Sequence, residues 1–415
     1  MDRRRAGIVS IAAAAFIFAL GTAAHGATIT VNSLADPSAT GACTLHDAIV
    51  AANTMIATNG CAAGTGDDTI QFNVTGTILL GNTLPEVTGT LTINGPASPG
   101  ITIDGDRKVR VLEIALGATV HLDRVTIAHG VGPTFPPGGG ISNIGTLTIT
   151  RSTFSGNSTT IRGGGIFNSG TLTVVNSTFS GNIATGQNNG LPGLGGGIFN
   201  SGTLTVVNST FSGNIAARSS DGTFSGSLGC AIFGGSLSVT TSTFAGNNVA
   251  GGCTGIDGTG PIKGTILAQN GRNCAGPQAD AGYNISDDGS CVFAKTGSAN
   301  NGDNIDPLLS PAGLADNGGP TQTIALQSGS PAIDAIPIAD CTDQASPPNQ
   351  ITTDQRGFPR SDAAEQVCDI GAYEFQDVRF AGQPGKPNCR GKSVSALVQQ
   401  FGDLDAAARR SGSLA

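Results

Sequence analysis

The chain has 415 residues, a formal net charge of −8 and 12% charged residues, with 63 glycines and no tryptophan. Scarce helix formers and plentiful turn formers favour many short strands joined by corners. No basic stripe appears in the mature chain, so the composition argues against nucleic acid as a partner.

Residues 1–26 have the pattern of a secretory signal peptide. Arginines at positions 3–5 precede an apolar run from Ile8 to Leu20, and small residues follow with a predicted cut near Ala24 or Gly26. The run is short for a membrane span and no second run follows it, although an uncleaved anchor is the alternative. We therefore expect an extracytoplasmic protein that is secreted, on the cell surface or periplasmic, without a transmembrane segment after cleavage.

The segment from Thr44 to Asn53 is predicted to be a short helix within an N-terminal cap of about residues 28–66. Its apolar positions, which fall on one helical face, are Leu45, Ala48, Ile49 and Ala52. A disulfide between Cys43 and Cys61 would tie down the loop that carries this helix.

A dense group of charges follows further along the chain. Its members with catalytic potential are Asp104, Asp106, Arg107, Asp123 and Arg124. Polysaccharide lyases and hydrolases place such carboxylates beside a basic side chain on an exposed sheet face, so this cluster is a candidate catalytic site. A solvated surface of charged residues explains the cluster just as well.

A repeated unit dominates the middle of the sequence, most clearly over residues 138–270. Twenty-two residues recur unchanged at 163–184 and 195–216, with looser copies on either side. Each copy begins a Leu-x-Ile/Val strand and has a phenylalanine seven residues later. These anchors are Leu147, Leu172, Leu204 and Leu237, followed by Phe154, Phe179, Phe211 and Phe244.

Alternating apolar and polar residues within each copy indicate strands with one buried face. A single rung is too short to bury that face alone, so the repeat predicts stacked rungs about 4.8 Å apart. The predicted fold is all-β: a right-handed parallel β-helix over residues 28–306, with a short N-terminal capping helix and a C-terminal capping segment. Asparagines at two turn positions, such as Asn168 and Asn182, are expected to form hydrogen-bonded ladders.

The repeat region lacks the residues that catalysis or metal binding needs, because no Asp, Glu or Lys occurs between Thr126 and Ala217. It offers an aromatic column instead. If the preceding isoleucines point inward, Phe167, Phe199 and Phe233 point outward and stack, where they would hold sugar rings or a partner protein. The alternative is that the long loops nearby fold over this column.

Nine cysteines fit disulfides of an oxidising compartment. Nearest-neighbour pairing suggests Cys43–Cys61, Cys230–Cys253, Cys274–Cys291 and Cys341–Cys368, although sequence alone leaves the connectivity open. Cys389 remains as a free thiol or as one that has lost its partner. No Cys-x-x-Cys spacing occurs and the chain has four histidines, so we expect neither a metal site nor a cofactor.

Several segments resemble known families. CTLHDAIVAAN at Cys43 to Asn53 is similar to the CSLREA motif of secreted bacterial β-helix proteins, with His46 and Asp47 in place of Arg and Glu. Residues 306–335 and the pieces DQRGFPR and CDIGAYEF within 354–375 resemble the choice-of-anchor Q domain, and GGGIFN and STFSGN are similar to repeats of polymorphic outer-membrane protein passengers.

The resemblance implies a β-helix displayed outside the cytoplasm, with no reaction attached to it. Residues 307–375 are expected to close the far end of the helix, and residues 376–415 to form a tail with a short amphipathic helix. We expect a structural or adhesive role, with a surface polysaccharide or another protein as partner and an unknown oligomeric state. The alternative is a polysaccharide-active enzyme that uses the Asp104–Arg124 cluster.

Overall fold

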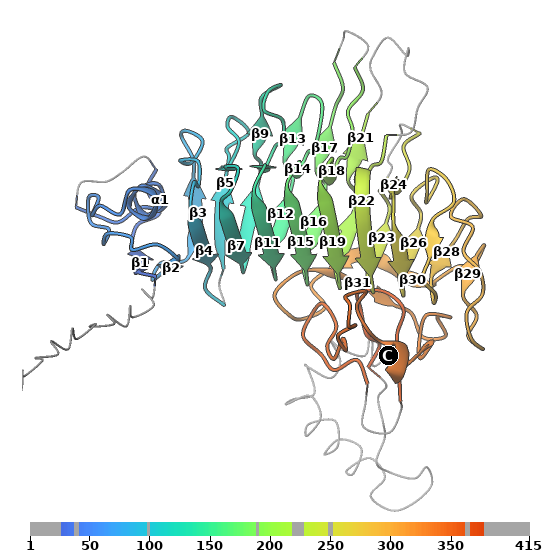
Figure 1. The fold of residues 1–415 in the computed structure, drawn as a ribbon. Helices are drawn as coiled ribbons and strands as arrows, with labels where there is room; N and C mark the ends of the chain where they lie inside the picture. The colour runs from blue at the N-terminus through green and yellow to red at the C-terminus, as the bar shows by residue number, and fades with distance from the viewer. Residues whose placement is uncertain are drawn as a thin grey trace, which may run out of the picture.

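A computed structural model describes residues 26–36, 41–97, 100–187, 191–217, 228–247, 252–361 and 366–376. The expected signal peptide, the tail helix and Cys389 lie outside these residues. The described chain is a parallel β-helix whose rungs succeed one another along one long axis, as Figure 1 shows from β1 to β29. The predicted fold class is thus confirmed.

Four columns of parallel strands, here numbered sheets 1 to 4, build the helix. Sheet 1 contains β1 (Thr28–Val31), β2 (Asp68–Phe72), β4 (Thr90–Asn94), β7 (Thr119–Asp123), β11 (Thr146–Thr150), β15 (Thr171–Val175), β19 (Thr203–Val207), β25 (Pro261–Lys263) and β27 (Ala279–Asp280). Sheet 2 contains β6 (Leu112–Ile114), β10 (Ile141–Asn143), β14 (Ile166–Asn168), β18 (Ile198–Asn200) and β24 (Ile256–Thr259). The long β22 (Ile232–Thr240) pairs with strands of both sheets and joins them into one 15-stranded sheet.

Sheet 3 contains β3 (Gly76–Leu79), β5 (Ile101–Asp104), β8 (Val125–Ala128), β12 (Thr153–Ser155), β16 (Thr178–Ser180), β20 (Thr210–Ser212), β23 (Thr243–Ala245), β26 (Ile266–Ala268), β28 (Ile285–Ser286) and β29 (Gly302–Asp303). Sheet 4 contains β9 (Val131–Gly132), β13 (Ser158–Thr159), β17 (Ile183–Ala184) and β21 (Ile215–Ala216). A complete rung therefore runs through one strand of sheets 2, 1, 3 and 4 in that order.

The core consists of equivalent side chains stacked from rung to rung. Leu147, Leu172, Leu204 and Leu237 are direct neighbours in the strand register, and all four are buried. The phenylalanines form a second buried column, in which the rings of Phe154, Phe179, Phe211 and Phe244 follow one another at 4.7, 4.8 and 4.7 Å. The stacking predicted from the repeat is therefore confirmed for both columns.

Asparagine ladders hold the corners of the rungs. The side-chain amide of Asn143 donates to Asn168, which donates to Asn200, in each case at 2.7 Å. A second buried ladder runs in order through Asn157, Asn182, Asn214, Asn247 and Asn270, with contacts of 2.8 to 3.0 Å. These bonds satisfy amides that would be costly to bury alone, as the sequence predicts.

The N-terminal end of the helix is covered by α1 (Leu45–Thr54), as Figure 1 shows. Thr44 caps this helix by accepting a hydrogen bond from the backbone of Asp47, whose carboxylate accepts from the Thr44 hydroxyl in return. The buried face includes Leu45, Ala48 and Ile49 as expected, whereas Ala51 is buried more deeply than Ala52.

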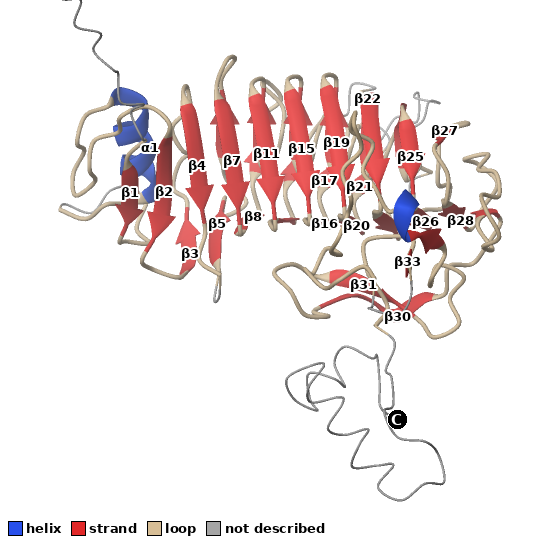
Figure 2. Cartoon of the chain, turned by 60° about the horizontal axis from the view of Figure 1, so that its bottom comes forward, coloured by secondary structure: helices blue, strands red, loops and turns tan. Residues whose placement is uncertain are grey.

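The C-terminal segment, residues 307–376, begins with the antiparallel pair β30 (Leu309–Ala315) and β31 (Thr323–Leu326). It continues through β32 (Ile336–Pro337), the short 3₁₀ helix Ile338–Asp340 and β33 (Val367–Cys368). Sequence reasoning placed this segment across the end of the β-helix, but it lies along the side, beneath sheet 3 in Figures 1 and 2. Its hydrogen bonds reach Thr178, Asn208 and Thr243, which belong to three successive rungs. The disulfide Cys274–Cys291 is buried in the core near the last rungs.

The structure contains disulfides at Cys43–Cys61, Cys230–Cys253, Cys274–Cys291 and Cys341–Cys368, which are the four pairs expected from neighbouring cysteines. Among the described residues, no helix has the length and apolar character needed to cross a bilayer.

Candidate functional site

The charged cluster singled out from the sequence is divided between two corners of the β-helix. Asp104, at the end of β5, accepts a hydrogen bond from His129 Nδ1 at 2.8 Å, and Asp106 forms an ion pair with Lys108 beside it. The backbone of Arg107 donates to the carbonyl of His129 at the same corner.

Asp123 lies at the opposite end of β8, a strand about 10 Å long. It receives two hydrogen bonds from Arg151, at 2.8 and 2.7 Å, and is 3.1 Å from Arg124. Burial alone would raise the pKa of Asp123, but hydrogen bonds from Arg151 and Thr150 and the nearby positive charges outweigh it, so the pKa lies below its usual value. Asp123 is therefore an ionised partner of arginines, far from Asp104 and Asp106, and the three carboxylates do not converge in one groove.

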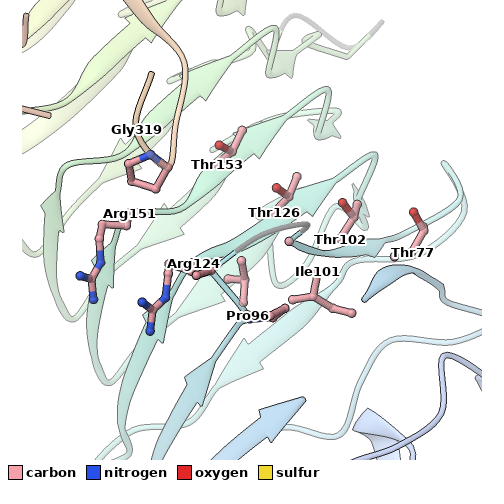
Figure 3. A pocket seen from close by; sticks show the side chains of 14 residues that line it. Thr77, Pro96, Ile101, Thr102, Arg124, Thr126, Arg151, Thr153 and Gly319 are labelled. Carbon is pink, nitrogen blue, oxygen red and sulfur yellow. The ribbon is translucent and has the colours of Figure 1, made fainter. Parts of the chain in front are cut away.

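Sheet 3 has a groove on its outer face, with a volume of about 390 Å³. Its floor is a column of outward-facing threonines in successive strands, Thr77, Thr102, Thr126 and Thr153. Figure 3 shows these hydroxyls in a row, with Arg124 and Arg151 along one side and the Gly319–Pro320 turn of the C-terminal segment at one end. Within the described chain, none of the four hydroxyls has a hydrogen-bond partner.

The two arginines occupy the same corner of successive rungs, where both have positive φ angles of 53° and 47°. Their guanidinium groups therefore point in the same direction, as Figure 3 shows. Their side chains are 30% and 45% exposed and share the single carboxylate of Asp123. The rim thus carries one excess positive charge on a chain that is negative as a whole.

The same threonine column continues under the C-terminal segment, where its hydroxyls are occupied. Thr178 donates to the carbonyl of Gln322 at 2.6 Å, and Thr210 donates to the Gln355 side chain at 2.6 Å. Thr243 accepts from the backbone of Ala372 at 3.0 Å. In the covered rungs, an extended chain with polar groups therefore fits along the threonine column. The groove is the part of the same column that the C-terminal segment leaves uncovered.

Sequence analysis missed the groove. A signal is present in the sequence, because Thr126, Thr153, Thr178 and Thr210 hold equivalent positions in their copies and therefore stack in one column.

The aromatic column is present and faces outward from sheet 2. The rings of Phe167 and Phe199 are 5.4 Å apart, and those of Phe199 and Phe233 are 5.6 Å apart. Phe167 and Phe233 are half-buried, whereas Phe199 is only 7% exposed. The guanidinium of Arg162 lies 5.0 Å above the ring of Phe199, so a side chain of the protein covers the middle of the column.

The DQRGFPR and CDIGAYEF pieces form a buried ionic network rather than an open site. Arg356 pairs with Asp354 and stacks on Tyr373, with its guanidinium carbon 3.6 Å from the ring centroid. Arg360 donates to Glu374 at 3.1 Å and to the Asn208 side chain of the β-helix at 2.8 Å. All of these groups are buried, so the network docks the C-terminal segment on the rungs.

No group of three or more His, Cys, Asp or Glu side chains in the described ranges is arranged to hold a metal ion. No family model matches the sequence, and no curated protein matches it. A crystal structure of Jun a 1, the major allergen from cedar pollen, is similar over 60% of this chain and 79% of that chain, with 14% identity and a TM-score of 0.29.

Proposed function

We propose that the chain is a secreted or surface-displayed β-helix protein that binds an acidic polysaccharide in the groove of sheet 3 without cleaving it. The observation that carries the proposal is the row of four unpartnered threonine hydroxyls beside Arg124 and Arg151. Hydroxyls both donate and accept, which suits the hydroxyl groups of a sugar chain, and the planar fork of arginine suits a carboxylate.

The absence of a shared carboxylate groove favours binding over cleavage. A glycosidase needs two carboxyl groups about 5 to 9.5 Å from each other on either side of the scissile bond, and a lyase needs a free base beside its substrate. Asp104 and Asp123 stand at opposite ends of β8, and each is paired with a basic side chain. The polysaccharide-active enzyme remains an outcome of the test below.

Three further features support the setting of this function. The signal-like N-terminus and the four disulfides fit an oxidising, extracytoplasmic location. The resemblance to choice-of-anchor Q and CSLREA-type proteins suggests display on a bacterial surface. We divide the chain accordingly into a β-helix of residues 28–306 that carries the binding surface and a docked segment of residues 307–375.

Binding of the full chain to polygalacturonate and alginate, measured by calorimetry, tests the proposal, with neutral dextran as the comparison polymer. Arg151→Ala should weaken binding about tenfold, since a charged hydrogen bond at a partly exposed site contributes about 1.5 kcal/mol. Thr126→Val should weaken it about fivefold without changing the charge, because a neutral hydrogen bond contributes about 1 kcal/mol. Arg272→Ala, at an exposed position elsewhere, is the matched control.

If Arg151→Ala and Thr126→Val bind the polymers as tightly as the wild type, the groove is not the binding site. Release of unsaturated or reducing sugars from the same polymers, lost in Asp123→Asn, would replace binding with catalysis.

The aromatic column is a second candidate contact, because Phe167 and Phe233 are partly exposed. Sugar rings stack on such side chains. Phe167→Ala should then weaken polysaccharide binding independently of Arg151→Ala, and an unchanged affinity would assign the column a packing role.

A further inference from the structure

The outer face of sheet 1 carries a second set of hydroxyls, arranged in two dimensions. The exposed column contains Thr90, Thr119, Thr146, Thr171, Thr203 and Ser236. The half-buried column beside it contains Thr92, His121, Thr148, Thr173, Thr205 and Ser238. We refer to these two columns together as the hydroxyl array.

Strand geometry fixes both spacings of the hydroxyl array. Neighbouring rungs are about 4.8 Å apart, and residues two apart on one strand are about 6.7 Å apart. The register of β4, β7, β11, β15, β19 and β22 continues without a bulge through both columns. Six rungs therefore extend the array over about 24 Å along the helix axis.

The hydroxyl array is also flat and stiff. Large parallel sheets normally twist unless ladders of equivalent side chains hold the strands in line, and the buried face of sheet 1 has such ladders, with Leu172 over Leu204 and Val174 over Val206. Figure 2 shows β4, β7, β11, β15 and β19 side by side with closely similar directions. Threonine adds rigidity of its own, because its branched Cβ restricts rotation of the side chain.

Every hydroxyl of the array is free to bind something outside the protein. None of the eleven Thr and Ser side chains has a hydrogen-bond partner within the described part of the chain. This contrasts with sheet 3, where Thr178 and Thr210 are bonded to the C-terminal segment. The C-terminal segment reaches only the margin of sheet 1, where Gln344 donates to Thr240.

The chemistry of the array selects the kind of ligand. His121 is the one titratable group among its twelve members, so a charged polymer finds no complementary charge there. The array contains no Phe, Tyr or Trp ring on which a sugar could stack. What the array offers is a rigid, uncharged grid of alternating hydroxyl and methyl groups, which suits a solid whose own hydrogen-bonding atoms repeat at the same two distances.

From these spacings we infer that the hydroxyl array binds the surface of ice. Crystalline water also presents evenly spaced rows of hydrogen-bonding oxygens, so a row of regularly spaced threonine hydroxyls can meet a row of lattice oxygens with small shifts of the side chains. Because the hydroxyls are already held in place, binding costs little conformational entropy. This inference is independent of the polysaccharide groove, which lies on sheet 3.

The test uses the full secreted chain and measures thermal hysteresis together with inhibition of ice recrystallisation. The wild type should arrest the growth of a single ice crystal and shape it. Thr171→Tyr, at an exposed position in the middle of the array, should reduce thermal hysteresis at least fivefold, because the larger ring holds the lattice away from the neighbouring hydroxyls. Thr185→Tyr, on the same rung but exposed beyond sheet 4, should match the wild type.

Circular dichroism of all three proteins verifies that the exposed substitutions leave the β-helix folded. A wild type without thermal hysteresis, or equal losses in the Thr171 and Thr185 variants, would overturn the inference. A second experiment measures whether the protein sediments with microcrystalline cellulose or chitin. If sedimentation depends on Thr171 and the protein has no effect on ice growth, the face binds a solid polysaccharide and the inference of ice binding is wrong.

Discussion

Replacing Arg360 with alanine should release the C-terminal segment from the β-helix while the rungs stay folded. The guanidinium of Arg360 is fully buried and joins the two parts of the chain. It donates to the side chain of Asn208 at 2.8 Å and, within the segment, to Glu374 at 3.1 Å. It also donates to the carbonyl oxygens of Asp369 and Gly371 at 3.0 and 2.6 Å.

The magnitude follows from what alanine leaves behind. Removing one partner of a buried ion pair costs about 3 to 5 kcal/mol when the remaining group stays charged. Burial raises the pKa of Glu374 well above its usual value, so this carboxyl can take up a proton when Arg360 is removed, and the range is an upper bound. Since about 1.4 kcal/mol corresponds to a factor of ten, the undocked population should rise by up to roughly 10² to 10³. Arg360→Lys keeps the charge but lacks the planar fork that reaches several acceptors, so it should recover only part of the loss.

Hydrogen exchange followed by mass spectrometry measures this release peptide by peptide, because amides of the segment exchange when it undocks. Peptides of residues 307–361 should exchange faster in Arg360→Ala, whereas peptides of β11, β15 and β19 should keep the wild-type rate, since rungs of a solenoid depend mainly on their neighbours. Arg272→Ala is the exposed control. Wild-type exchange of the segment, or equal acceleration of the rungs, would refute this account of the docking.

Three other outcomes are expected. Phe211→Ala should lower the free energy of unfolding by about 3 to 5 kcal/mol, measured by urea denaturation, because it opens a cavity in the buried phenylalanine column. Asn214→Ala should cost about 1 to 3 kcal/mol in the same assay, because the backbone and side-chain N–H groups of Asn182 lose their shared acceptor, Asn214 Oδ1. Burial raises the pKa of Asp369 to about 7, whereas in an undocked segment it should lie near 3.9. The docked form thus holds a proton that the undocked form releases. Docking should therefore be strongest below about pH 4 and should weaken as the pH rises through about 7. The urea midpoint for undocking of the segment should be lower at pH 8 than at pH 5.5.

The repeat predicts the helical part of the structure well, because each rung contacts its neighbours through the same residues. Once Leu172 and Leu204 are recognised as equivalent, parallel stacking fixes the register of the whole strand, and Phe179 follows over Phe211. The asparagine ladders follow from the same equivalence. The repeat in the sequence is therefore enough to predict every structural feature that recurs from rung to rung.

The position of the C-terminal segment does not repeat, and its sequence gives no period to follow. Its docking depends on single polar contacts between distant residues, such as Arg360 with Asn208, which lie 152 residues apart.

The charged cluster could not be placed from the sequence for a related reason. Asp104 and Asp123 are near each other in sequence, but strand β8 lies between the two corners that hold them, so proximity along the chain did not become proximity in space.

The same regularity gives three kinds of surface from one pattern of threonines. In sheet 3, Thr178 and Thr210 are covered and bonded within the chain, whereas Thr126 and Thr153 are open beside arginines. In sheet 1 the hydroxyls are open and almost without charge. Stacking fixes the hydroxyl spacing along the axis in both sheets, so the expected ligands differ because of what surrounds each column. Arginines line the groove of sheet 3, which favours a polymer with carboxylates. Two uncharged columns lie side by side on sheet 1, which favours an uncharged lattice.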